Sequence, residues 1–172
     1  MDLSAFYYDS TMHIAIASDH TGVDRKAEVV AALRADGHTV DDLGTDSTAP
    51  VDYPDYAERL GLTVIEGGAE RGVLICGSGV GASVAANKIP GIRASVCHDS
   101  YSAHQGVEHD NMNILVFGAR VIGSELAKEL ARIFVAARFS GEARHVRRLA
   151  KVHAMEERYG MHLPVGSATR PS

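Results

Sequence analysis

The stretch with the clearest chemical potential is a short apolar run that ends in a thiol and a glycine-rich turn. The order is Val73-Leu74-Ile75-Cys76, then Gly77-Ser78-Gly79-Val80-Gly81. Glycines at alternate positions let backbone N–H groups approach an anion closely, and a helix that starts here would turn its positive dipole end toward the thiol. These surroundings favour a thiolate, so Cys76 is a candidate base or nucleophile with the Ser78 hydroxyl beside it.

The alternative for Cys76 is a structural role, as a small apolar residue that ends a buried strand. A strand end alone does not need three glycines, however. The spacing does not match the G-x-G-x-x-G dinucleotide fingerprint, and no Lys-Ser/Thr pair follows as in a P-loop. Ala82 stands where the anion cradle of a cysteine phosphatase would need an arginine. The pattern therefore indicates a compact anion cradle with a thiol beside it.

Two further polar groups occur where expected strands meet loops. Asp19 and His20 follow an apolar run, and His109 and Asp110 precede another. Each pair has a structural alternative, a helix cap with an exposed histidine for the first and a polar turn for the second. The nine histidines do not form an H-E-x-x-H motif, and no C-x-x-C is present, so we expect no metal and no cofactor.

Arginines are the third kind of candidate site residue. Arg144 and Arg148 are four residues apart on an expected helix, so their guanidinium groups emerge on one face and could clamp a phosphate. The alternative is a solvated basic face supported by Glu142. Arg120 follows the last expected strand. Together these groups fit proton abstraction α to the carbonyl of a sugar phosphate. The arginines would bind the phosphate, the His and Asp side chains would move hydroxyl protons, and the thiol lies near an oxyanion cradle.

Strands alternating with helices must position these residues. We expect strands over residues 12–17, 38–43, 72–76, 92–96 and 113–118. We expect helices over 25–36 with Asp24 as the cap, 52–64 with Pro54 in the first turn, from the glycine turn to Lys88, over 98–107, from Ser124 as the cap, and over 142–158. The alternation predicts an α/β protein, a single-domain three-layer αβα sandwich with a five-stranded parallel, Rossmann-like sheet. The strand order stays open.

Length and composition fit this fold. The 172 residues suit one domain, which we place at 12–159, after an N-terminal extension (1–11) and before a C-terminal tail (160–172). A net charge of −5 argues against a general nucleic-acid binder, and no apolar segment is long enough for a membrane span. Two cysteines and the lack of a signal peptide suggest a cytoplasmic protein.

The motif set resembles the family of type B ribose-5-phosphate isomerases, which also includes galactose- and allose-6-phosphate isomerases. The matching segments run in order over about residues 12–159. They are 16–22, 52–54, 75–81, 85–88, 91–94, 109–113, 117–120 and Arg144-His145-x-x-Arg148. Cys76 places the chain with the thiol-using relatives rather than with those that use a carboxylate.

The resemblance implies an aldose–ketose isomerase that interconverts ribose 5-phosphate and ribulose 5-phosphate without metal or cofactor. Cys76 would move the proton between C1 and C2, and Ser78 would transfer the proton between O1 and O2. The amides of the turn with Gly77, Gly79 and Gly81 would hold the enediolate. His109 would open the furanose ring, with Asp19 assisting. The other roles implied are phosphate binding by His20, Arg144, Arg148 and Arg120, and contacts to the sugar by Tyr53 and Asp110. Relatives are homodimers, sometimes tetramers, with shared sites, so His109 and Asp110 would come from the neighbouring subunit.

Two departures bear on the substrate. Ser78 stands where many relatives have threonine, which keeps the hydroxyl. Asp110-Asn111 reverses the common Asn-Asp order, which puts a carboxylate where an amide often contacts the sugar. A hexose 6-phosphate isomerase therefore stays open as an alternative. So do a non-catalytic sugar-phosphate sensor and a flavodoxin-like nucleotide binder, which would tolerate Cys76→Ala.

Overall fold

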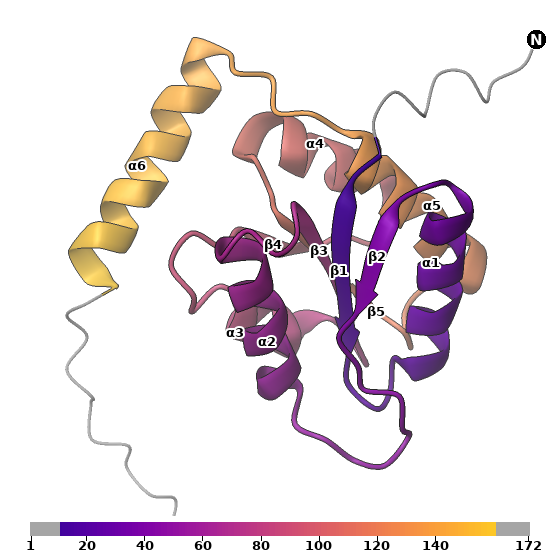
Figure 1. Ribbon diagram of the computed structural model, residues 1–172. Helices are drawn as coiled ribbons and strands as arrows, with labels where there is room; N and C mark the ends of the chain where they lie inside the picture. Colours follow the sequence, from indigo (N-terminus) through magenta and orange to yellow (C-terminus); the bar gives the residue numbers. More distant parts are fainter. Residues whose placement is uncertain (1–10, 161–172) are drawn as a thin grey trace, which may run out of the picture.

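The computed structural model describes residues 11–160, which form a parallel sheet covered by helices (Figure 1). The predictions for 1–10 and 161–172 lie outside the described residues. The five strands are β1 (His13–Ser18), β2 (Thr39–Asp42), β3 (Arg71–Cys76), β4 (Ala94–Val96) and β5 (Ile114–Gly118). They lie in the order β2-β1-β3-β5-β4, and every neighbouring pair is parallel. This confirms the predicted α/β fold and supplies the strand order that the sequence left open.

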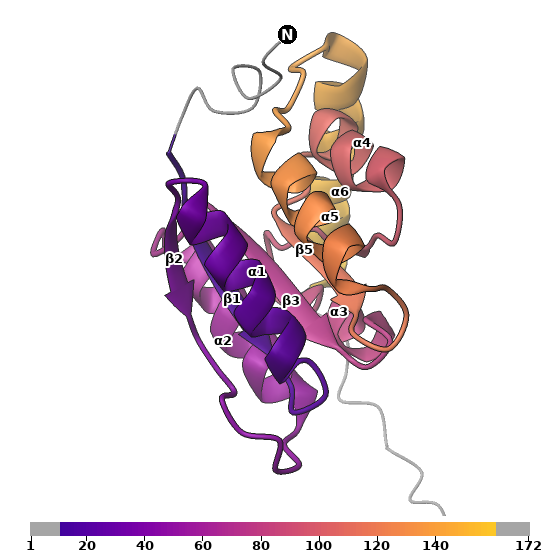
Figure 2. The ribbon, with the colours of Figure 1, turned by 90° about the vertical axis from the view of Figure 1, so that its right-hand side faces the viewer.

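Helices cover both faces of the sheet (Figure 2). Within residues 11–160 the helices are α1 (Val23–Ala35), α2 (Tyr53–Ile65), α3 (Val80–Ala86), α4 (Ser100–Asp110), α5 (Ser124–Ala136) and α6 (Ala143–Tyr159). One core joins α1, α4 and α5 to the sheet and includes Phe117 and Phe134. The other joins α2 and α3 and includes Leu60 and Leu74. All six residues of β3 are buried, as expected for a strand with helices on both sides.

Among the helices within residues 11–160, only α4 begins with a side-chain cap hydrogen bond, and two predicted caps are corrected. Asp99 is the N-cap of α4, and its carboxylate accepts the Ser102 N–H at 2.7 Å. Neither Asp24 nor Ser124 is a cap as predicted. The N-caps of α1 and α5 are Gly22 and Gly123, so Asp24 and Ser124 lie inside the first turns. An acidic residue in the first turn still favours α1 through the helix dipole.

Helix α4 continues three residues beyond the predicted end. His109 and Asp110 therefore belong to its last turn rather than to a polar turn after the helix. Asn111 then closes the helix in the left-handed conformation with φ of 49°, which asparagine tolerates better than most residues.

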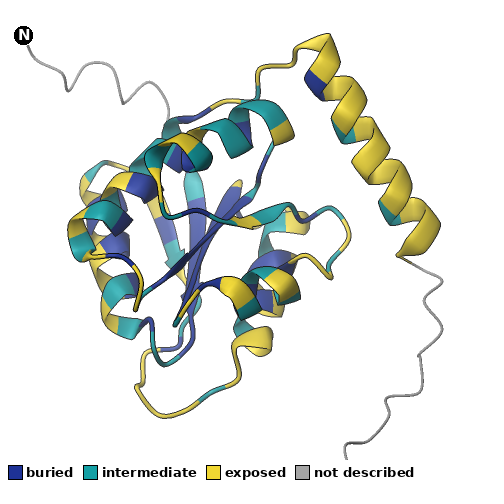
Figure 3. Ribbon diagram, turned by 180° about the vertical axis from the view of Figure 1, so that it is seen from behind, coloured by how far each residue is buried: buried dark blue, intermediate teal, exposed yellow. Residues whose placement is uncertain are grey.

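Helix α6 differs from the others because it stands apart from the body (Figure 1) and exposes most of its surface (Figure 3). His145 is its one buried residue. Near its far end the Glu156 carboxylate accepts the Gly91 N–H at 2.8 Å. The exposed apolar side chains of α6 are Val146, Val152, Met155 and Tyr159.

Two cations are buried within the fold. Lys26 on α1 is 1% exposed and donates to the carboxylates of Asp42 and Asp46, which ties the loop after β2 to α1. Arg71 at the start of β3 donates to backbone carbonyls at the end of α5, among them Ala137 at 2.8 Å. Burial lowers the pKa of Arg71 to about 10, which still leaves it charged at neutral pH.

No helix within residues 11–160 is both long enough and apolar enough to cross a membrane.

Candidate active site

The strand order places a topological switch point at the carboxyl ends of β1 and β3. These strands are neighbours, with Ser18 opposite Ile75, yet β2 follows on one side of the pair and β5 on the other. Chain connections leave the sheet in opposite directions at such a point, and open α/β sheets bind ligands there. The loops at this switch point begin with Asp19 and Gly77, so the two strongest sequence motifs meet at one place.

Cys76 is the last residue of β3 and is 5% exposed. Its Sγ atom accepts a hydrogen bond from the Gly79 N–H at 3.1 Å. Gly79 has φ of +86°, and a Cβ atom there would lie 3.1 Å from the Phe117 carbonyl carbon. Only glycine fits both conditions without strain, so the turn can fold back and direct its amide at the sulfur.

The rest of the turn is built around side chains from other loops. Ser78 is exposed, and its hydroxyl accepts the Val80 N–H at 3.3 Å. A Cβ atom at Gly77 would lie 3.7 Å from the Arg120 guanidinium, and one at Gly81 would lie 2.8 Å from the Tyr53 ring. The missing side chain of Gly81 thus leaves room for the Tyr53 ring against the turn, whereas the Gly77–Arg120 approach is an ordinary van der Waals contact.

Asp19 and His20 are fixed by hydrogen bonds rather than serving as a helix cap. The Asp19 carboxylate accepts the N–H of Thr21 at 2.8 Å and its hydroxyl at 2.6 Å. The His20 Nδ1 atom accepts the Val51 N–H at 3.2 Å. An accepting Nδ1 places the proton of a neutral imidazole on Nε2. Thr21 and Val51 were not singled out from the sequence, although Thr21 lies within the 16–22 motif.

These residues form the carboxyl-edge cluster, which we define as Asp19, His20, Tyr53, Cys76, Ser78 and Arg120. The remaining candidates lie elsewhere, in the amino-edge cluster, defined as His109, Asp110, Arg144 and Arg148. Asn111, next to the end of α4, lines a small cavity with Met12 and Arg71 at the amino ends of β1 and β3. A six-residue strand at ~3.3 Å per residue is about 17 Å long, so one chain does not bring His109 to Cys76.

Within the amino-edge cluster, α4 and α6 meet through two histidines. The ring centroids of His109 and His145 are 4.1 Å apart. Gln105 contacts His109 Nδ1 at 2.7 Å, and Ser140 contacts His145 Nδ1 at 2.7 Å. The side chains of Arg144 and Arg148 are exposed, and Arg144 pairs with Glu142 at 2.9 Å. Gln105 and Ser140 carried no signal in the sequence, whereas His145 lies within the Arg144-His145-x-x-Arg148 motif.

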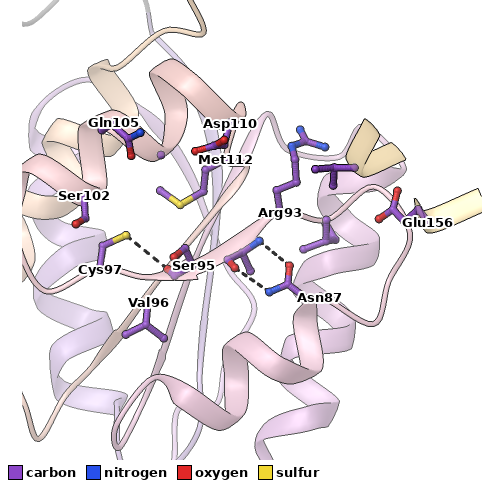
Figure 4. Close-up of a pocket in the computed structure, with 14 residues that line it drawn as sticks. Asn87, Arg93, Ser95, Val96, Cys97, Ser102, Gln105, Asp110, Met112 and Glu156 are labelled. Carbon is purple, nitrogen blue, oxygen red and sulfur yellow. Dashed lines mark hydrogen bonds between the residues drawn. The ribbon is translucent and has the colours of Figure 1, made fainter. Parts of the chain in front are cut away.

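A cavity of about 540 Å³ lies between β4, α4 and α6 (Figure 4). Asp110 lines it together with Cys97, Met112, Val152 and Glu156. Burial raises the pKa of the Cys97 thiol, so this second cysteine stays protonated at neutral pH. The described residues contain no group of three or more His, Cys, Asp or Glu side chains arranged to hold a metal ion.

Comparisons with known proteins identify the family. The model of the ribose/galactose isomerase family matches residues 14–152. Ribose-5-phosphate isomerase B of Escherichia coli is 46% identical over 145 residues, which cover 84% of this chain and 97% of the relative. D-erythrulose-4-phosphate isomerase of Pectobacterium atrosepticum is 42% identical over 132 residues, covering 76% of this chain and 86% of the relative.

The fold also matches that of a solved relative. The structure of ribose-5-phosphate isomerase B from Clostridium thermocellum superposes with a TM-score of 0.84 at 43% identity, covering 86% of this chain and 99% of that one. Sequence and fold agree over nearly the full length of these relatives. This chain belongs to the ribose/galactose isomerase family, and within that family it resembles the type B ribose-5-phosphate isomerases.

Proposed function

We propose that this protein interconverts ribose 5-phosphate and ribulose 5-phosphate, with Cys76 as the base that moves the proton between C2 and C1. Membership of the family supports a sugar-phosphate isomerase in general. The observation that carries the specific proposal is the Cys76 sulfur, which is held at the sheet's switch point by the Gly79 amide. A small substrate bound at this switch point would have Ser78 and Asp19 from the two adjoining loops beside it.

The proposed reaction starts from the closed sugar. His109 donates a proton to the ring oxygen O4 while the O1 hydroxyl proton passes toward Asp19, so the C1–O4 bond breaks and a C1 aldehyde forms. The Cys76 thiolate then removes the proton from C2. The electron pair of the C–H bond forms a C1–C2 double bond, and the negative charge collects on O1.

The enediolate is completed and resolved by the same turn. The Ser78 hydroxyl transfers a proton from O2 to O1, and the amides of Gly77, Gly79 and Gly81 stabilise the oxygen charge. The Gly79 N–H turns from the sulfur to the oxygen once Cys76 has taken up the proton. The Cys76 thiol returns its proton to C1, which gives the ketose and regenerates the thiolate. Positioned amide donors are typically worth about 3 kcal/mol each in such transition states.

The phosphate is bound by His20, Arg144 and Arg148, with Arg120 contributing, while Tyr53 and Asp110 contact the sugar. Since no cofactor is needed to move a proton within one substrate, we assign none. The substrate of the Pectobacterium relative has four carbons, so we also propose that chain length, from four to six carbons, be tested directly.

The proposal includes a homodimer, or a tetramer built from such dimers, in which each site combines two chains. Two features support it. The carboxyl-edge cluster and the amino-edge cluster lie at opposite ends of β3, and α6 exposes the apolar side chains of Val146, Val152, Met155 and Tyr159. A two-fold axis would cover the apolar face of α6 and place each amino-edge cluster over the partner's carboxyl-edge cluster. Two unpaired cysteines accord with the proposed cytoplasmic location.

The experiment uses two readouts on wild type, Cys76→Ala and His109→Ala. Isomerisation of ribose 5-phosphate requires ring opening. Exchange of the C1 proton of ribulose 5-phosphate with D2O does not, because its O5 is phosphorylated and no furanose can close. Cys76→Ala should lower both rates by about 10³-fold or more. His109→Ala should lower the first rate about 100-fold and leave exchange nearly unchanged.

Cys97→Ala is the matched control and should keep both activities. Wild-type activity on ribose 5-phosphate with full retention in Cys76→Ala would refute the assigned base. Tight phosphosugar binding without any C1 exchange in wild type would instead favour a sugar-phosphate sensor.

A further inference from the structure

His145 is an unusual residue for its position in the fold. It is the one buried residue on a helix that otherwise faces solvent, and it is 1% exposed. Its ring packs against the ring of His109 at 4.1 Å between centroids, with 33° between the planes. A histidine ring held in this way contributes to the position of its neighbour, because packed side chains have few alternative rotamers.

Ser140 fastens His145 to the end of α4. The Ser140 hydroxyl lies 2.7 Å from His145 Nδ1, and the Ser140 N–H donates to the Glu108 carbonyl at 3.0 Å. The same hydroxyl accepts the Glu142 N–H at 3.3 Å. One residue in the connection between α5 and α6 therefore links the His145 ring to the backbone beside His109.

Gln105 determines which nitrogen of His109 carries the proton. The Gln105 amide nitrogen lies 2.7 Å from His109 Nδ1, and an amide nitrogen only donates. Nδ1 is then the acceptor, so a neutral His109 carries its proton on Nε2. The nearest charged group to Nε2 on α4 is the Glu108 carboxylate at 3.7 Å, which is too long for a hydrogen bond.

We propose that His145, anchored by Ser140, is a positioning residue that holds the His109 ring with its Nε2–H directed at the substrate, while Gln105 fixes the tautomer. The inference rests on the proposed function, in which His109 protonates the ring oxygen of the closed sugar. It assigns a role to residues that would contact no substrate atom. It also explains why a histidine is buried on an otherwise exposed helix.

Charges around the pair support the arrangement. Burial lowers the pKa of His145, and the charges of His109, Arg144 and Arg148 lower it further, against the opposing effect of Glu142. The lowered pKa favours the neutral form of His145 at neutral pH. A neutral partner can stack against His109 in either protonation state without charge repulsion.

The test compares His145→Ala, His145→Phe and Gln105→Leu, with His153→Ala on the exposed part of α6 as the matched control. His145→Ala should slow isomerisation of ribose 5-phosphate 10- to 100-fold, since small displacements of a catalytic group have effects of about this size. C1 exchange of ribulose 5-phosphate should stay within twofold, and so should KM. His145→Phe keeps a flat ring and should recover most of the lost rate.

Gln105→Leu gives a second measurement that does not depend on the stability of α6. Nitrogen NMR of the full-length protein should show neutral His109 with its proton on Nε2 in wild type and a mixture of tautomers in Gln105→Leu. Ring-form activity should fall accordingly, with exchange retained.

Three results would overturn the proposal. Equal losses of ring-form and exchange rates in a folded His145→Ala protein would show a general structural role. No rescue by His145→Phe would show that ring packing is not the cause. An unchanged ring-form rate in His145→Ala, with a large loss in His109→Ala, would refute the positioning role and leave the proposed function intact. If His109→Ala itself keeps the ring-form rate, the proposed function fails at that step.

Discussion

Mixing two inactive variants tests the shared site. We consider Cys76→Ala, which damages the carboxyl-edge cluster, and His109→Ala, which damages the amino-edge cluster. In a mixed dimer, one site takes its sulfur from the His109→Ala chain and its imidazole from the Cys76→Ala chain. That site is intact, and the other site lacks both groups.

The expected recovery follows from this geometry. Random association makes about half of the dimers mixed, and each has one intact site of two, so about a quarter of wild-type activity on ribose 5-phosphate should return. Mixed dimers purified through two different tags should reach about half. Sites within one chain should contribute little, because a strand about 17 Å long separates the two clusters.

The assay is ribose 5-phosphate turnover after co-refolding, with mixed dimers verified by mass. Cys76→Ala mixed with Ser78→Ala is the matched control, and it should recover nothing because both changes fall in the same cluster. Absence of recovery in verified Cys76→Ala/His109→Ala dimers would refute the shared site. Recovery in the Ser78→Ala control would equally refute the assignment of residues to the two clusters.

Three predictions concern stability at fixed protein concentration and are measured by urea unfolding. Gly79→Ala should lower the free energy of unfolding by about 2 kcal/mol, because alanine is strained at φ of +86°. Gly123→Ala should cost less, because φ is −78° and the space around it is open, although alanine is a poorer N-cap than glycine. Lys26→Met should lower the free energy of unfolding by about 2 kcal/mol, because the Asp42 carboxylate loses a charged donor. The exposed Lys88→Met is the control, and an equal loss of stability there would contradict this reasoning. Burial is the main cause that lowers the pKa of His38, so below pH ~6.5 the unfolded chain binds protons that the folded chain does not. Stability should therefore decrease as the pH falls from 7.5 to 5.5, and less steeply in His38→Gln.

The carboxyl-edge cluster was predictable because its signals are local. An apolar run that ends in Cys76 and alternating glycines define a strand, a turn and a helix start within eleven residues. Parallel strands bring their carboxyl ends to one edge, so Asp19 and Cys76 were expected at the same edge whatever the strand order. That they are neighbours follows from the pairing of β1 with β3, which the sequence left open.

The amino-edge cluster was less predictable for two physical reasons. His109 and Asp110 are polar enough to suggest a turn, but α4 includes them because Asn111 supplies the left-handed residue that ends a helix. The contact of His109 with His145 depends on how α6 meets α4, and this is a long-range event without a local sequence signature. The position of β5 between β3 and β4 is non-local in the same way.

The central strand has a consequence for how turnover can proceed. β3 is paired on both sides and buried over its whole length, so the sulfur at its end is attached to backbone that is among the last to open. The sulfur therefore keeps its position during local opening of other parts of the structure. Any rearrangement that admits sugar or releases product must then come from the surrounding loops and, in the proposed dimer, from the second chain, so these outer parts would set the rate of turnover.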